Sequence, residues 1–143
     1  MAKDVNIVEK VQKSFTRRVF AKCDLPKRSY DERLIFFGID SLQTRRAKCD
    51  IILLYKMSKG IIDLSLSSFF PVDRYRRVGI RSNGMSLLHP FTPKLDVVNH
   101  SFAFRVRRLW NSLPVECVQA SNVSVFVAQV DKYFTAHPIV QTD

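Results

Sequence analysis

The sequence lacks most of the features that mark a secreted or membrane-spanning protein. Its three cysteines, Cys23, Cys49 and Cys117, are odd in number and lie far apart. That count is typical of reduced thiols in an intracellular protein and argues against a disulfide framework. No apolar signal segment follows Met1, and no apolar run reaches the roughly 18 residues of a membrane span. We therefore expect an intracellular protein, in the cytoplasm or nucleus, with no membrane partner.

The motifs of common enzymes are also missing. The cysteines and the three histidines form no C-x-x-C or C-x-x-H unit, so we expect no metal site. There is no G-x-x-x-x-G-K-[ST] phosphate loop, and no G-x-S-x-G turn that would present a nucleophile. We predict no catalytic residue, no cofactor and no small-molecule substrate.

Length and hydrophobic content predict one folded domain over residues 1–143. A chain of 143 residues matches the common domain size. Its hydrophobic content of 46% is too high for an intrinsically disordered protein. Three subregions are expected within this domain, with helices over 1–60, an irregular stretch or hairpin over 61–99, and helices again over 100–136.

The charge balance is the strongest signal in the composition. The chain has 23 Lys and Arg against 13 Asp and Glu, a net charge of +10. The pI is about 9.9, and a pI above about 9 with clustered basic residues is expected of a nucleic-acid-binding domain. The alternative is a basic, solvated surface that binds no ligand.

Apolar spacings of three and four predict a mainly α fold with four or five helices. The first helix, over 4–23, carries an apolar stripe and a basic stripe about a third of a turn away. The apolar stripe consists of Ile7 or Val8, Val11, Phe15 and Val19, and the basic stripe of Lys10, Lys13 and Arg17. Pro26 follows the helix and disfavours its continuation.

Capping residues mark the next helices. Ser29 and Glu32 have the capping-box spacing, which predicts a helix over 30–37 that stops at Gly38. Ser41 can cap a helix over 42–58. The residues of that helix expected to face the core are Leu42, Cys49, Ile52, Leu53 and Met57.

The remaining elements are a hairpin and two helices. Asn83 and Gly84 favour a tight turn, which predicts at most a short hairpin over 78–88. A helix opens at Asn99 or Ser101 and stops at Pro114, and a last helix covers 124–134. Trp110 lies on an apolar stripe, so we interpret it as a core anchor with Leu113 and Phe126 rather than as a base-stacking residue.

Three short runs in fixed order give the chain a family resemblance. They are V-E-K-V-Q-K-S-F-T-R-R from Val8, Y-D-E-R-L from Tyr30 and L-W-N-S-L-P from Leu109. The region after the polymerase core of non-LTR (LINE-type, jockey-like) retrotransposon reverse transcriptases is similar, with E-x-V-Q-x-x-F-T-R-R, Y-x-x-R-L and W-N-S-L-P in that order. Between them, Leu42, Arg45, Arg46 and residues 50–56 resemble that family's S-L-x-x-R-R-x-x-x-D-x-x-x-x-Y-K helix.

The resemblance implies part of an RNA-directed DNA polymerase, but the polymerase chemistry is absent. That chemistry needs paired aspartates to hold two metal ions against nucleotide phosphates. This chain has no Asp-Asp pair. We therefore expect a non-catalytic C-terminal fragment and not an enzyme.

Backbone phosphates of RNA or DNA are the expected partner, bound without sequence preference. The candidate nucleic-acid-binding residues lie on three helices and one loop. They are Lys10, Lys13, Arg17, Arg18, Arg45, Arg46, Arg76, Arg77, Arg105 and Arg108. Arg18 and Arg46 have an alternative structural role, in pairs with Asp31 or Glu32 and with Asp50.

Two further functions remain open from the sequence. The chain can be a scaffold that packs on the polymerase core of the same element, a role that an exposed apolar patch would indicate. It can also be a decayed retroelement remnant with no activity of its own.

Overall fold

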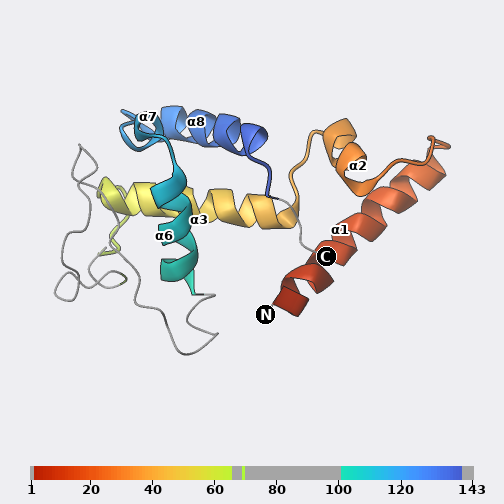
Figure 1. Cartoon of the computed structure of the whole chain (residues 1–143), viewed down its shortest axis with the longest axis horizontal. Coiled ribbons are helices and arrows are strands. Elements are labelled where there is room, and N and C mark those ends of the chain that lie inside the picture. Colours follow the sequence, from red (N-terminus) through yellow and green to blue (C-terminus); the bar gives the residue numbers. More distant parts are fainter. Residues whose placement is uncertain (1, 66–68, 70–100, 140–143) are drawn as a thin grey trace. The chain divides into compact units, whose positions relative to one another are not determined.

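The computed structural model describes residues 2–65, 69 and 101–139 (Figure 1). These residues form helices and no strand, so the prediction of a mainly α fold is confirmed. The helices are α1 (Ala2–Lys22), α2 (Tyr30–Phe37), α3 (Leu42–Ser58), α6 (Phe102–Ser112), α7 (Val115–Val118) and α8 (Val123–Ala136). The hairpin predicted over 78–88 lies outside the described residues.

Local capping explains where the helices begin and end. The Ser29 hydroxyl accepts a hydrogen bond from the Glu32 amide, and the Glu32 carboxylate accepts one from the Ser29 amide at 2.7 Å. Gly38 ends α2 with a φ of 61°, which glycine adopts without the steric cost of a Cβ atom. The hydroxyl of Ser41 accepts from the Thr44 amide, and Asn122 caps α8 in the same way.

The chain divides into two compact units. The N-terminal unit comprises the residues up to Arg46 together with Ile139, and the C-terminal unit runs from Ala47 to Pro138. The first turn of α3 therefore belongs to one unit and the rest of that helix to the other. Whether the chain behaves as the single domain expected from its length stays a prediction.

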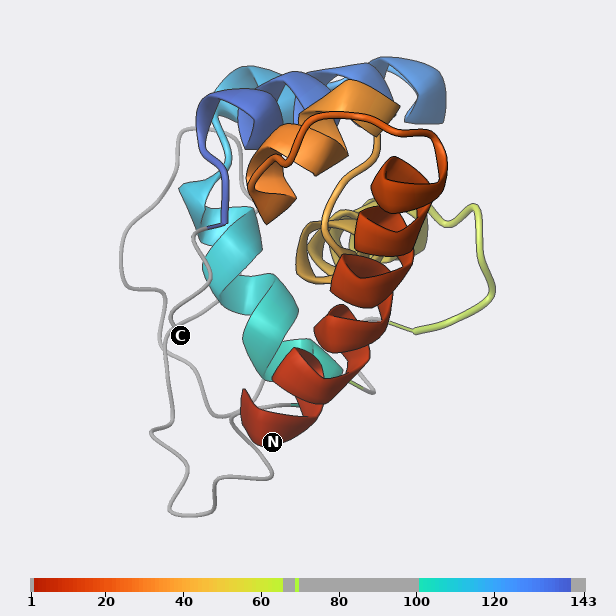
Figure 2. The same cartoon turned by 90° about the vertical axis from the view of Figure 1, so that its right-hand side faces the viewer.

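In the N-terminal unit, α2 runs in the same general direction as α1. The contacts advance along both helices in the same order, from Tyr30 near Glu9 to Phe37 near Phe20. Residues 23–29 lead back from the end of α1 to the start of α2 (Figure 2). Phe20 is buried and meets the rings of Phe36 and Phe37 edge-on, which closes one end of this helix pair.

In the C-terminal unit, α8 lies alongside α3 and runs antiparallel to it (Figure 1). Tyr55 of α3 stacks on Phe126 of α8 with ring centroids 4.1 Å apart, and the Tyr55 hydroxyl donates to the Ala120 carbonyl. Trp110 of α6 lies 6.0 Å from Phe126 and is 1% exposed. Leu113 is buried as well, so Trp110, Leu113 and Phe126 all lie in one core.

The prediction of which α3 residues are buried is only partly correct. Met57 is buried, but Cys49 is exposed, and Leu42, Ile52 and Leu53 are half-buried. The buried residues of α3 in the C-terminal unit are Ala47, Ile51, Leu54, Tyr55 and Met57. Apolar residues occupy almost every position from 51 to 55, so their spacing does not select a face. The stacking of Tyr55 on Phe126 shows which face of α3 is turned toward the core.

Candidate nucleic-acid interface

Helix α1 has three faces, and the buried one is polar. Glu9, Gln12 and Thr16 recur at spacings of three and four and are 2%, 9% and 0% exposed. Phe20 continues this face at its end. The apolar residues Ile7, Val8, Val11 and Phe15 are exposed instead. An apolar stripe normally marks the buried side of a helix, but in α1 the apolar stripe is exposed.

The carboxylate of Glu9 is the centre of the buried polar face. It accepts a hydrogen bond from the hydroxyl of Tyr30 on α2. It also accepts from the backbone amides of Leu42 and Gln43, at 3.2 and 3.3 Å. These are the first two amides of α3, which have no partner within their own helix. A carboxylate at a helix N-terminus is favoured by the helix dipole, so Glu9 caps α3 from 33 residues away.

Gln12 and Thr16 extend this network. The Gln12 amide donates to the Tyr30 hydroxyl and to the Asp40 carbonyl, and its oxygen accepts from the Arg45 guanidinium at 2.6 Å. The Thr16 hydroxyl donates to the Gln12 carbonyl and accepts from Nε of Arg33. Buried polar groups are costly unless they are hydrogen-bonded, and each of these side chains has partners.

The environment of Tyr30 shifts its acidity. Burial, and then the neighbouring Glu9 carboxylate, raise the pKa of the Tyr30 hydroxyl far above the ordinary value near 10. The proton is retained because the phenolate would have to form next to a carboxylate in a poorly solvated position. Tyr30 therefore remains a hydrogen-bond donor to Glu9 across the neutral and mildly alkaline range.

Three of the four predicted cations of α1 lie together on the third face. Lys10 and Arg17 are exposed, at positions i and i+7 of one side of the helix. Lys13 lies between them and is half-buried, with its ammonium 5.2 Å from the centre of the Tyr30 ring. Arg18 is exposed too, but it lies three residues after Phe15, on the apolar side of the helix. Lys10, Arg17 and Arg18 have no carboxylate partner among the residues that the structure describes. We call Lys10, Lys13 and Arg17 the basic stripe.

Two of the other predicted cations are held by the protein itself. Arg105 forms an ion pair with Asp50, with Nε 2.9 Å and Nη2 3.2 Å from the carboxylate oxygens. Arg45 is exposed, but its guanidinium is bound to Gln12. Arg105 is half-buried and anchors α6 to α3, because a two-point arginine–carboxylate contact fixes orientation as well as distance.

The remaining candidates are scattered. Arg46 and Arg108 are exposed, and they belong to different units. The partner of Asp50 is Arg105, not Arg46 as the alternative for that residue supposed. Arg76 and Arg77 lie outside the described residues. The cations that the structure brings together on one continuous surface are those of α1.

The polar network as a whole was not predicted from the sequence. Arg33 was not a candidate, although it links α2 to Thr16 and to the Arg28 and Lys13 carbonyls. A signal was present, because Glu9, Gln12 and Thr16 share one helical face. A polar face beside an apolar one normally lies in solvent, and here only the partners from α2 and α3 show that the polar face is buried.

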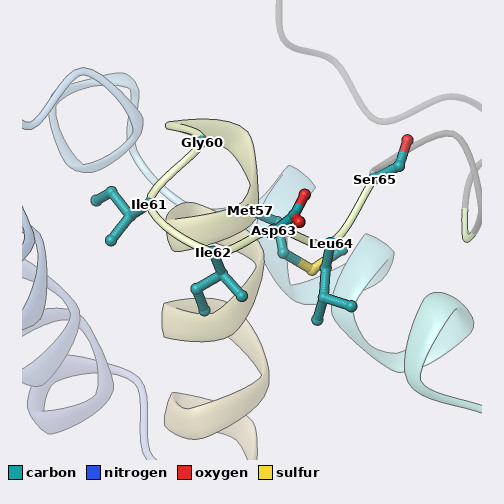
Figure 3. A pocket seen from close by; sticks show the side chains of 7 residues that line it. All are labelled: Met57, Gly60, Ile61, Ile62, Asp63, Leu64 and Ser65. Atoms are coloured by element: carbon teal, nitrogen blue, oxygen red, sulfur yellow. The ribbon is translucent and has the colours of Figure 1, made fainter.

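A hollow of about 540 Å³ lies at the end of α3. Its lining consists of Met57 and the consecutive residues Gly60, Ile61, Ile62, Asp63, Leu64 and Ser65. Figure 3 shows these side chains spread along one stretch of chain, with Asp63 as the sole carboxylate among them. A binding site usually gathers several polar groups from different elements, and this lining does not.

In residues 2–65, 69 and 101–139, no three His, Cys, Asp or Glu side chains are placed to share a metal ion. None of the helices in this part of the chain combines the length and the hydropathy that a membrane span needs.

Comparison of the chain with protein-family models, with curated proteins and with solved structures finds no match.

Proposed function

We propose that the chain is the non-catalytic C-terminal part of a non-LTR retrotransposon reverse transcriptase, and that it holds template RNA or its cDNA duplex through backbone phosphates. Catalysis is not part of this role, because the sequence has no paired aspartates. Contacts to phosphates position a nucleic acid and carry little sequence information. The binding should therefore be non-specific.

The basic stripe on α1 is the observation that carries the proposal. Lys10 and Arg17 are seven residues apart, which is about 10 Å along a helix axis. Phosphates on one strand of a duplex recur about every 3.4 Å along its axis, so the stripe spans roughly three of them. The buried network around Glu9 holds α1 against α2 and α3, so these cations are presented by a fixed helix rather than by a loop.

The contacts between the family-like runs add support. Glu9, Gln12 and Thr16 of the first run bind Tyr30 and Arg33 of the second. In the C-terminal unit, Trp110 of the third run packs on the same Phe126 ring as Tyr55 of the α3 motif. Residues that contact one another have a physical reason to occur together in one chain.

A scaffold role is the second candidate, and the exposed apolar residues of α1 favour it. Exposed apolar patches often mark protein–protein contact sites. In this alternative α1 packs on the polymerase core of the same element, and the cations only keep the surface solvated.

Salt-dependent binding distinguishes the two candidates. Full-length protein would be titrated into a structured RNA and into a duplex DNA at several salt concentrations. Phosphate binding releases counterions, so affinity should fall steeply as salt rises. Absence of salt-dependent binding would leave the scaffold role as the better account.

A further inference from the structure

We propose that the outer face of α1 binds an amphipathic helix that carries carboxylates along both edges of its own apolar stripe. The outer face consists of Ile7, Val8, Val11 and Phe15. A protein partner on this face goes beyond nucleic-acid binding, although Lys10 and Arg17 of the basic stripe border the face.

The exposure of the outer face is the first observation. Ile7, Val8, Val11 and Phe15 are 59%, 56%, 69% and 64% exposed. Single exposed apolar side chains are ordinary, but these four are neighbours at spacings of three, four and seven on one helix. Another face of α1 carries the buried network of Glu9, Gln12 and Thr16, so α1 cannot turn to bury its apolar residues without breaking that network.

The spacing indicates a helical partner. Anchors at i, i+4 and i+7 or i+8 are the pattern by which one amphipathic helix lies against another. Ile7, Val11 and Phe15 have this pattern and span about 12 Å along the axis. Three of the four residues are aliphatic, which is a poor surface for stacking bases. The face is also short for an interfacial membrane helix, since membrane binding grows with the apolar area inserted.

Charge on both edges of the outer face specifies the partner's chemistry. Lys10 and Arg17 border one edge. Gln12, four residues after Val8, borders the other, and it holds the exposed guanidinium of Arg45 there through one hydrogen bond, which leaves other N–H donors for a carboxylate. Arg18 and Lys22 lie at the C-terminal end of the face and are exposed. Of the two acidic residues in α1, Glu9 is buried, and Asp4 lies at the N-terminal end of the outer face, three and four residues before Ile7 and Val8. A partner helix with carboxylates on both flanks would meet cations on either side.

The same charges argue against a second copy of the chain. Two antiparallel α1 helices would place the Lys10 and Arg17 edge of one against the same edge of the other. Like charges in such a position destabilise the pair. An acidic partner removes this repulsion.

A pair of synthetic peptides tests the proposal. Both are amphipathic helices with leucine at i, i+3, i+4 and i+7, flanked by glutamate in one and by lysine in the other. Binding of each dye-labelled peptide to the full-length protein would be measured by fluorescence anisotropy. We expect the glutamate-flanked peptide to bind at least roughly ten-fold more tightly. Equal binding of the two peptides would overturn the charge argument.

Variants locate the binding surface. Val11→Ser with Phe15→Ser should weaken peptide binding roughly ten-fold or more, since buried apolar anchors carry most of the energy of such contacts. Ile35→Ser on α2, where the isoleucine is 80% exposed, is the matched control and should change nothing. Full peptide affinity in the Val11/Phe15 variant would overturn the proposal.

Further measurements on the Val11/Phe15 variant distinguish an acidic helix from other molecules that could cover the outer face. They also test the proposal independently of nucleic-acid binding. The wild type would be tested for self-association and for binding to anionic phosphatidylserine vesicles. If the wild type showed either behaviour and the Val11/Phe15 variant lost it, the proposal would be overturned. A loss of RNA affinity in that variant would also overturn it, because the variant keeps every cation. Unchanged RNA binding with lost peptide binding supports the proposal, and the outcome does not depend on whether the chain binds nucleic acid.

Discussion

Tyr30 donates its hydroxyl hydrogen to the buried carboxylate of Glu9, and this bond ties the start of α2 to the middle of α1. The same carboxylate receives the first two amides of α3. One glutamate therefore joins α1, α2 and the first turn of α3, and the basic stripe is presented by the helix that this glutamate fixes in place.

Removal of the Tyr30 hydroxyl should destabilise the N-terminal unit. Tyr30→Phe deletes a hydrogen bond to a buried charged group, which is worth about 1.5–3 kcal/mol. Urea unfolding followed by circular dichroism would measure the loss. Tyr133→Phe is the matched control, because the Tyr133 hydroxyl bonds to Ser112 in an exposed position. Equal stability of the two variants would show that the Glu9 contact contributes little.

In an alkaline titration, the Tyr30 hydroxyl should lose its proton late. The chain has four tyrosines, and the pKa of Tyr30 is raised by burial and by Glu9. We expect its tyrosinate absorbance to appear only after ordinary tyrosines have titrated near pH 10. Loss of the last-titrating component in Tyr30→Phe would assign it, and a Tyr30 that titrates near pH 10 would contradict the described environment.

The same shift makes stability depend on pH. The unfolded chain loses the Tyr30 proton at an ordinary pKa near 10, whereas the folded chain keeps it. The contribution of Tyr30 to the free energy of unfolding is therefore complete below about pH 10 and declines as the pH rises further. The stability difference between wild type and Tyr30→Phe should shrink over that range. A stability difference between wild type and Tyr30→Phe that grows above pH 10 would contradict a raised pKa of Tyr30 in the folded chain.

Truncation of Trp110 should disrupt the C-terminal unit rather than a binding site. Trp110 is buried against Phe126, so Trp110→Ala should cost about 3–5 kcal/mol and unfold or aggregate the protein. Trp110→Phe keeps much of the packing and should stay folded with unchanged affinity for RNA. A folded Trp110→Ala protein that has lost only nucleic-acid affinity would favour base stacking instead.

Arg105 and Asp50 should be coupled in stability. Their side chains are 25% and 13% exposed and form a two-point contact. A double-mutant cycle with Asp50→Ala and Arg105→Ala should give a coupling of roughly 0.5–3 kcal/mol. Arg105→Ala should leave the salt dependence of RNA binding unchanged. A weaker salt dependence in that variant would return Arg105 to the set of phosphate contacts.

Much of the fold could be predicted because its signals are local. Ser29, Glu32 and Gly38 fix both ends of α2 through atoms within a few residues, and the predicted ends of the longer helices agree closely with the structure. The four-residue helix α7 was missed because it has no apolar period of its own. Local signals of this kind depend little on the rest of the molecule.

The buried face of α1 could not be predicted in this way. The burial of Glu9 depends on Tyr30 and on amides 33 and 34 residues away, and no spacing within α1 reveals them. The sequence likewise predicts Arg105 as a phosphate contact, but Asp50, 55 positions earlier, binds it in the structure. Charge predicted a nucleic-acid partner, but which cations are available to it depends on these long-range pairs.

The central claim is that the basic stripe of α1 binds phosphates, and the salt dependence of RNA affinity tests it most directly. Lys10, Lys13 and Arg17 would be replaced together by alanine. The control variant replaces Lys22, Lys27 and Lys132, three other exposed lysines, so that both variants lose the same charge.

On duplex DNA the logarithm of affinity falls by about 0.9 per neutralised phosphate as the logarithm of salt rises, and on single strands by about 0.7. If the stripe makes these contacts, its removal should reduce the slope by about two to three units and weaken all sequences alike, whereas the control should change it far less. An unchanged slope in the stripe variant, or an equal change in both variants, would contradict the claim.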